Sequence, residues 1–142
     1  MKKLFLLLFL GLLSLFAACS EGLTEGPSDQ AEVSDNLQVH WQTVSATEAY
    51  GMMTELDSFI LLDVRTEAEF REARIAGAIL LPFDEILDRA EAELLDKDAV
   101  ILVYCQSGRR SAAAAADLAA LGYTRVYDFG GIITWPYETV RG

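Results

Sequence analysis

The chain has 142 residues, enough for one folded domain, and 52% of them are hydrophobic. Its 22 acidic and 11 basic side chains give a formal net charge of −11 at pH 7. Nucleic-acid binding needs a basic surface that neutralises phosphates, so this charge argues against a nucleic-acid partner and is better understood as an aid to solubility.

The N-terminus has the pattern of an export signal. Lys2 and Lys3 precede an apolar stretch over residues 4–16, which is shorter than the ~20 residues that a membrane-spanning helix needs. Residues 16–19, Phe-Ala-Ala-Cys, resemble a bacterial lipobox, although Phe16 replaces the usual Leu. The resemblance implies that residues 1–18 are a lipoprotein signal peptide and that lipid on Cys19 anchors the chain in the bacterial cell envelope. Secretion without lipid and an uncleaved anchor remain alternatives.

The segment after the signal peptide is expected to be a disordered tether. Residues 19–37 contain five acidic residues and no basic one, together with Gly, Pro and Ser, and cannot build a core. If the cell is Gram-negative, Ser20 after the lipidated Cys19 implies the periplasmic face of the outer membrane. The folded domain is expected over residues 38–142. His40, the one histidine, is assigned to its surface rather than to a role as general base.

The rest of the chain alternates between predicted strands and helices. Strands are expected over residues 39–44, 59–63, 77–81, 99–104 and 124–129. Helices are expected over residues 46–56 after a Ser45–Glu48 capping box, and over residues 67–71, 83–95, 112–121 and 132–135. Phe70, Leu87 and Ile133 are expected to contribute to the core, and Gly130 and Gly131 to turn the chain. This alternation predicts an α/β fold whose central, mostly parallel sheet binds ligands beyond the carboxyl ends of its strands.

A cysteine stands at one of those strand ends. The apolar run over residues 99–104 leads into Cys105, and a short loop with Gly108, Arg109 and Arg110 joins it to an Ala-rich helix. Loop amides, the helix dipole and the two guanidinium groups all favour an anion, while Gly108 permits a positive φ. The sequence therefore predicts that Cys105 is a thiolate, the nucleophilic form, at the floor of an anion-binding pocket.

Residues 105–111, Cys-Gln-Ser-Gly-Arg-Arg-Ser, resemble the active-site loop of rhodanese-like sulfurtransferases. Further segments resemble the family's other signatures in order: residues 59–70, residues 74–79, and Gly130–Gly131 with Trp135. The likeness covers about residues 39–138 and implies a three-layer rhodanese-like domain. Arg74 and Ala76 stand where the family often has His and Pro, which is expected to alter the pocket rim or a partner surface and to leave the chemistry unaffected.

The resemblance implies a sulfurtransferase that carries sulfur as a Cys105 persulfide. The donor would be a compound such as thiosulfate, and the acceptor cyanide, a small thiol or a protein thiol. The persulfide and substrate would be held by Gln106, Ser107, Gly108, Arg109, Arg110 and Ser111, although Ser111 could equally serve only to open the helix. Arg110 is weakly favoured over Arg109 as the side chain facing the pocket. Asp63 and Arg65 are expected to form a structural ion pair that holds the loop, with a catalytic role as the alternative.

Neither a cofactor nor a metal site is expected, since one free Cys and one His cannot build a zinc site. With Cys19 lipidated, Cys105 would have no partner for an internal disulfide. A sulfur carrier or sensor without fast turnover remains an alternative, because it would keep the same loop. A phosphatase is disfavoured: related cysteine phosphatases place Arg six positions after the cysteine, where this chain has Ser111.

Overall fold

The computed structural model describes residues 41–142. The predictions for the signal peptide, Cys19, the tether and His40 lie outside the described residues and stay predictions. Among the helices of residues 41–142, none combines the length and the apolar character needed to cross a bilayer.

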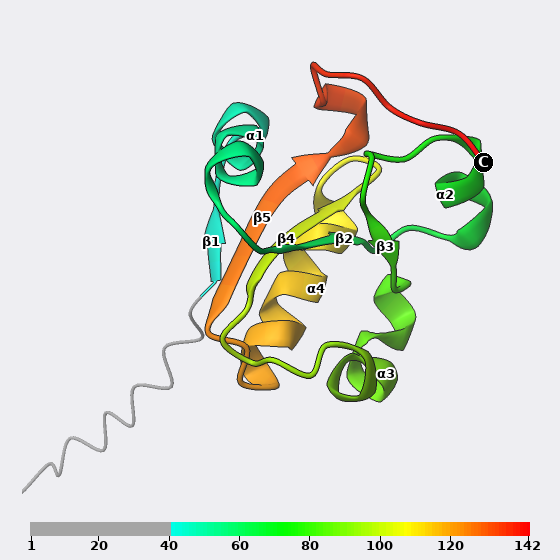
Figure 1. Ribbon diagram of the computed structural model, residues 1–142. Helices are drawn as coiled ribbons and strands as arrows, with labels where there is room; N and C mark the ends of the chain where they lie inside the picture. Colours follow the sequence, from blue (N-terminus) through cyan, green and yellow to red (C-terminus); the bar gives the residue numbers. More distant parts are fainter. Residues whose placement is uncertain (1–40) are drawn as a thin grey trace, which may run out of the picture. The chain divides into compact units, whose positions relative to one another are not determined.

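Five strands of this region form one fully parallel sheet in the spatial order β1-β5-β4-β2-β3 (Figure 1). They are β1 (Trp41–Thr43), β2 (Ile60–Asp63), β3 (Ile79–Leu80), β4 (Val100–Cys105) and β5 (Arg125–Gly131). The central strand, β4, is buried along its whole length, as its continuous apolar sequence predicts. The predicted α/β fold with a parallel central sheet is confirmed.

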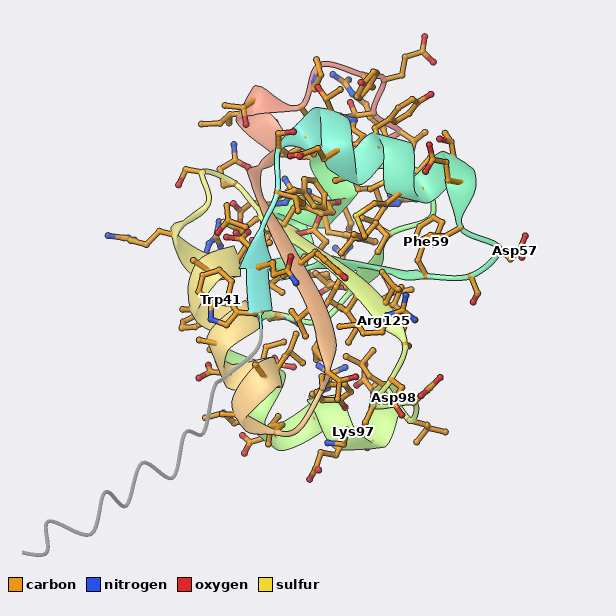
Figure 2. The ribbon with its side chains drawn as sticks, turned by 90° about the vertical axis from the view of Figure 1, so that its left-hand side faces the viewer. Trp41, Asp57, Phe59, Lys97, Asp98 and Arg125 are labelled. Atoms are coloured by element: carbon orange, nitrogen blue, oxygen red, sulfur yellow. The ribbon has the colours of Figure 1, made fainter. Side chains whose placement is uncertain are left out.

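Helices cover both faces of this sheet. α1 (Ala46–Glu55) packs on one face, and α3 (Ile86–Glu93) and α4 (Arg109–Ala120) pack on the other. Alternate residues of β4 serve the two cores: Ile101 and Val103 pack toward α3 and α4, and Leu102 and Tyr104 pack toward α1. Figure 2 shows one residue of each side, Trp41 beside α4 and Phe59 beneath α1.

The remaining elements are short. α2 (Glu67–Glu72) follows β2 and has no buried residue, and two 3₁₀ turns cover Phe83–Glu85 and Ile132–Thr134. Both α1 and α2 begin with a complete capping box, Ser45 with Glu48 and Thr66 with Glu69. The same local device therefore starts a helix at two separate places in the fold.

Four predictions about element boundaries were wrong. α4 begins at Arg109 rather than at residue 112, because Gly108 adopts φ 103° and acts as the helix N-cap. Gly130 and Gly131 end strand β5 instead of forming a separate turn, next to a register irregularity between Val103 and Cys105. The segments expected as helices over residues 83–95 and 132–135 are, respectively, a 3₁₀ turn continued by α3 and a single 3₁₀ turn.

Three residues expected in the core are not buried there. Leu87 is 61% exposed, because α3 faces α4 through Ile86 and Ala90 and the next residue after Ile86 is rotated away. Ile133 is 64% exposed on its 3₁₀ turn. Phe70 is partly buried and lies under the guanidinium of Arg74, 4.8 Å from the ring centroid, since α2 sits at the margin of the sheet.

Candidate active site

Cys105 ends β4 and is 1% exposed. Residues 106–108 then turn the chain into the first turn of α4. Because the strands are parallel, the ends of β2 and β5 lie on either side: Asp63 pairs with Tyr104, and Gly131 pairs with Cys105 itself. The thiol thus lies where the sequence predicts a ligand site, at the carboxyl edge of the sheet. Lys97, Asp98 and Arg125, labelled in Figure 2, lie at the amino ends of β4 and β5, away from it.

The loop after Cys105 is built to hold an anion. The amide of Gly108 donates to Cys105 Sγ at 3.1 Å, and the positive φ of Gly108 turns that amide inward. Burial by itself raises the pKa of Cys105, but hydrogen bonds from Ser111, Gly108 and Ser107 outweigh burial and lower it. The arrangement therefore favours the thiolate, the form that attacks electrophiles.

Ser111 is buried in the first turn of α4 and has two roles in the geometry. Its hydroxyl lies 3.0 Å from the carbonyl oxygen of Gly108 and 3.1 Å from that of Gly130, and it also contributes to lowering the pKa of Cys105. A hydroxyl has one hydrogen, so the two carbonyl oxygens and the sulfur compete for it. The side chain joins the loop to the end of β5 and remains a donor for a negatively charged sulfur.

The two loop arginines differ. Arg109 is exposed, whereas Arg110 is partly buried and its pKa is raised, chiefly by a hydrogen bond to Glu69 and in smaller part by Cys105. Two guanidinium nitrogens of Arg110 donate to the two oxygens of Glu69 at 3.0 and 2.7 Å. Arg110 is thus the loop arginine whose charge interacts with the sulfur of Cys105.

Glu69 is a residue of this site that sequence analysis missed. The hydrogen bond from Arg110 is the main cause that lowers the pKa of Glu69 to about 2, so the carboxylate is ionised at any working pH. In the sequence, Glu69 is recognisable only as the second residue of the Thr66–Glu69 capping box, a pattern that predicts the start of a helix and nothing about the site. The contact with Arg110, 41 positions along the chain, requires the tertiary fold.

Asp63 and Arg65 form a buried ion pair beneath the loop. Arg65 Nη2 donates to Asp63 Oδ2 at 2.7 Å and Nε to Oδ1 at 2.9 Å, with side chains 3% and 0% exposed. The same guanidinium donates to the carbonyl oxygen of Ala73 at 2.6 Å and to Oε1 of Gln106 at 3.2 Å. Asp63 therefore fixes Arg65, and Arg65 holds the first residue of the loop.

Gly131, at the end of β5, supports the loop from the other side. A Cβ on Gly131 would lie 2.4 Å from Gln106 O and 2.6 Å from the Cα of Ser107, so no side chain fits there. The carbonyl oxygen of Gln106 also accepts from the amide of Ile133 at 3.3 Å. Gly131 is a second residue whose importance to the site the sequence analysis did not assign.

Replacing Gly131 with alanine is expected to push the loop outward and raise the pKa of Cys105, because the new Cβ displaces Gln106 and Ser107. Loss of the inward amides should slow iodoacetamide alkylation several-fold at neutral pH, because a smaller fraction of the thiol is then ionised. The overpacking should also cost about 1–3 kcal/mol of unfolding free energy. The measurement is the alkylation rate as a function of pH.

Gly51→Ala is the matched control. Gly51 lies within α1, and a Cβ there would meet nothing within 4 Å. This variant should keep the wild-type alkylation profile and gain about 0.5–1 kcal/mol of stability. An unchanged alkylation profile in Gly131→Ala would show that the loop geometry does not depend on this contact.

Two cavities are relevant to the site. One of about 460 Å³ adjoins it, lined by Arg65, Glu69, Glu72, Ala73, Gln106, Ile132, Ile133 and Thr139. A larger one, of about 830 Å³, lies between α1 and the C-terminal segment, and none of its lining residues belongs to the 105–111 loop. The smaller cavity reaches the 105–111 loop through Gln106, next to Cys105 in the chain. Within residues 41–142, no group of three or more His, Cys, Asp or Glu side chains converges to hold a metal ion.

Comparison with known proteins gives a consistent picture. Residues 45–135 match the family model described as "Rhodanese-like domain". The chain is 33% identical over 81 residues to "Thiosulfate sulfurtransferase PspE" of Escherichia coli, covering 57% of this chain and 78% of that protein. It is 38% identical over 84 residues to a "Sulfurtransferase" of Allochromatium vinosum, covering 58% of this chain and 77% of the relative. A solved structure, "rhodanese with anions from E. coli", superposes with a TM-score of 0.56 at 32% identity, covering 60% of this chain and 100% of the other.

Proposed function

The chain belongs to the family of rhodanese-like domains, and from this premise we propose that it is a rhodanese-type enzyme that moves a sulfane sulfur from a donor such as thiosulfate to a thiophilic acceptor. The observation that carries the proposal is the buried thiol at the end of β4, whose pKa is lowered by hydrogen bonds from the loop and first helical turn after it. A stabilised thiolate at the floor of an anion-binding loop is what attack on a sulfur–sulfur bond requires.

In the first step the Cys105 thiolate attacks the outer sulfur of thiosulfate. A new S–S bond forms, the old one breaks, and sulfite leaves with its electron pair. The product is a persulfide whose outer sulfur carries negative charge. The amide of Gly108, which already donates to the resting thiolate, lines the space that this sulfur enters, and Arg110 attracts the anionic donor.

In the second step the acceptor attacks the outer sulfur of the persulfide. Cyanide becomes thiocyanate, or a thiolate becomes a persulfide, and the electron pair of the breaking S–S bond returns to Cys105. The cavity beside Gln106 provides the approach, with the exposed Ile133 and the acidic Glu72 at its lining. The cycle thus consumes one donor and one acceptor and returns Cys105 to the thiolate. The acceptor can be a small thiol or a cysteine of a partner protein.

We further propose that this chemistry takes place at the bacterial cell envelope, with lipid on Cys19 as the anchor. The support is the sequence of residues 1–19: a basic start, an apolar stretch and the lipobox-like ending.

Intact-mass analysis of the full chain tests the proposed reaction. Thiosulfate is expected to add one sulfur atom per protein, and cyanide to remove it with one equivalent of thiocyanate. An adduct that forms and resists cyanide and small thiols, yet passes to a protein thiol, would support the carrier alternative instead. A mass unchanged by thiosulfate and by other sulfane donors would contradict both.

A further inference from the structure

We infer that Glu69 is a specificity-determining residue that restrains the preference of the site for doubly charged sulfur donors. By occupying Arg110, its carboxylate reduces the positive charge that a donor meets above Cys105, so that singly charged and uncharged donors compete better with a dianion such as thiosulfate. The inference deepens the proposed sulfurtransferase function and rests on it for the identity of the reactants.

The geometry of the pair supports a fixed position for both groups. The contact is bidentate, with N–O distances of 3.0 and 2.7 Å, and the side chains of Arg110 and Glu69 are 30% and 27% exposed. Paired parallel hydrogen bonds of this kind orient the guanidinium as well as neutralising it. The partners come from two elements, α2 and the first turn of α4, so the ion pair ties these two elements together beside the loop.

Glu69 is itself held in place by a second set of contacts. One carboxylate oxygen accepts from the amide and the hydroxyl of Thr66, at 2.9 and 2.7 Å, in the capping box of α2. The carboxylate also lines the cavity beside Gln106. The Glu69 carboxylate is therefore ionised, fixed in position and part of the lining of this cavity. Its negative charge acts on every donor that passes through the cavity.

Glu69 neutralises Arg110 and not the other arginines near it, because those have partners of their own. Arg65 is neutralised by Asp63 and buried, and Arg71 is paired on the surface with Glu67. The raised pKa of Arg110 has a contribution from Cys105, which places its charge in reach of the sulfur. Removing the charge of Glu69 therefore adds about one unit of positive charge to the site.

The size of the effect scales with donor charge. The Coulomb energy of a dianion in a given field is twice that of a monoanion and that of a neutral compound is zero. If neutralising Glu69 improves kcat/KM about threefold for a monoanion, the improvement for a dianion is about ninefold. The ratio between the two donors is then expected to shift about threefold toward the dianion, and high salt should shrink that shift.

Glu69→Gln in the full chain is the test. Glutamine keeps the capping box, because Glu and Gln both serve at that position. Its amide oxygen can still accept from Thr66 and from Nη1 of Arg110, while the second bond, to Nη2, is lost because an amide NH₂ group cannot accept. The kcat/KM ratio of thiosulfate to benzenethiosulfonate, a monoanion, should rise about threefold. Glu48→Gln is the matched control: Glu48 has the same role in the Ser45 capping box of α1, so the ratio should not change.

A second readout does not depend on turnover. Iodoacetate and iodoacetamide have similar shapes and differ by one negative charge, so the ratio of their alkylation rates at Cys105 reports the field at the sulfur. Glu69→Gln should raise that ratio about threefold. Unchanged ratios in both assays, or an equal loss with every reagent, would overturn the inference and indicate a purely structural role. Wild-type protein that turns over neither donor would refute the proposed function, and the alkylation ratio would still decide the inference.

Discussion

Replacing Cys105 with serine is expected to lower kcat/KM for thiosulfate by about 10⁴-fold or more, a loss typical of removing an enzyme's nucleophile. A serine hydroxyl stays protonated under conditions where the loop keeps a thiol ionised, and oxygen cannot hold a sulfane sulfur as a persulfide. The measurement is thiocyanate formation from thiosulfate and cyanide. No sulfur adduct should appear in the intact mass of the variant.

The substitution should leave the fold intact. Cys105 is 1% exposed, and a serine there is slightly smaller and still accepts from the amide of Gly108. The urea unfolding midpoint shows whether the variant is folded, and Glu48→Gln in α1 serves as an active control. Product formation by the folded serine variant at the wild-type rate would mean that sulfur passes through another group.

The structure also bears on the phosphatase alternative. Position 111, where related phosphatases would need an arginine, holds a serine that is turned inward to the carbonyl oxygens of Gly108 and Gly130. Arg110, one position earlier, is engaged by Glu69. The loop arginine whose charge reaches the sulfur is thus already paired, which disfavours a grip on three phosphoryl oxygens.

The elements that the sequence predicted well are those with local causes. The continuous apolar run of β4 requires cover on both faces, and the Ser45–Glu48 capping box sets the start of α1 within a few residues. Cys105 follows from the same logic, because a polar residue at the end of a buried parallel strand lies at the ligand edge. The start of α4 was placed three residues late, since the N-cap role of Gly108 depends on its φ.

The features that were missed depend on contacts between distant segments. Glu69 contacts Arg110, which lies 41 positions later in the chain. Gly131, at the end of β5, packs against Gln106, which directly follows β4. Neither has a local pattern beyond a capping box and a pair of glycines. Leu87 shows the converse. Its position fits the apolar period of a helix, yet α3 packs against the core through a narrow face that contains Ile86 and Ala90 and leaves Leu87 exposed. Sequence periodicity indicates which residues are apolar, and packing decides which of them are covered.

Replacing Asp63 with asparagine is expected to lower the free energy of unfolding by about 3 kcal/mol or more. The change leaves the Arg65 guanidinium buried without its counter-ion, and removing one partner of a buried pair costs about 3–5 kcal/mol. Asparagine keeps the shape of the side chain, so the loss reports charge rather than a cavity. Urea unfolding at neutral pH gives the value.

Glu67→Gln provides the comparison for that measurement. Glu67 and Arg71 form an ion pair of the same kind, but their side chains are 67% and 64% exposed. Such a pair in water contributes at most about 0.5 kcal/mol. The gap between the two variants therefore measures what burial adds to a salt bridge in this fold. If both variants lost the same small amount of unfolding free energy, Ala73 O and Gln106 Oε1, which also accept from Arg65, would suffice to stabilise its charge. The loop would then be supported by those two contacts rather than by Asp63.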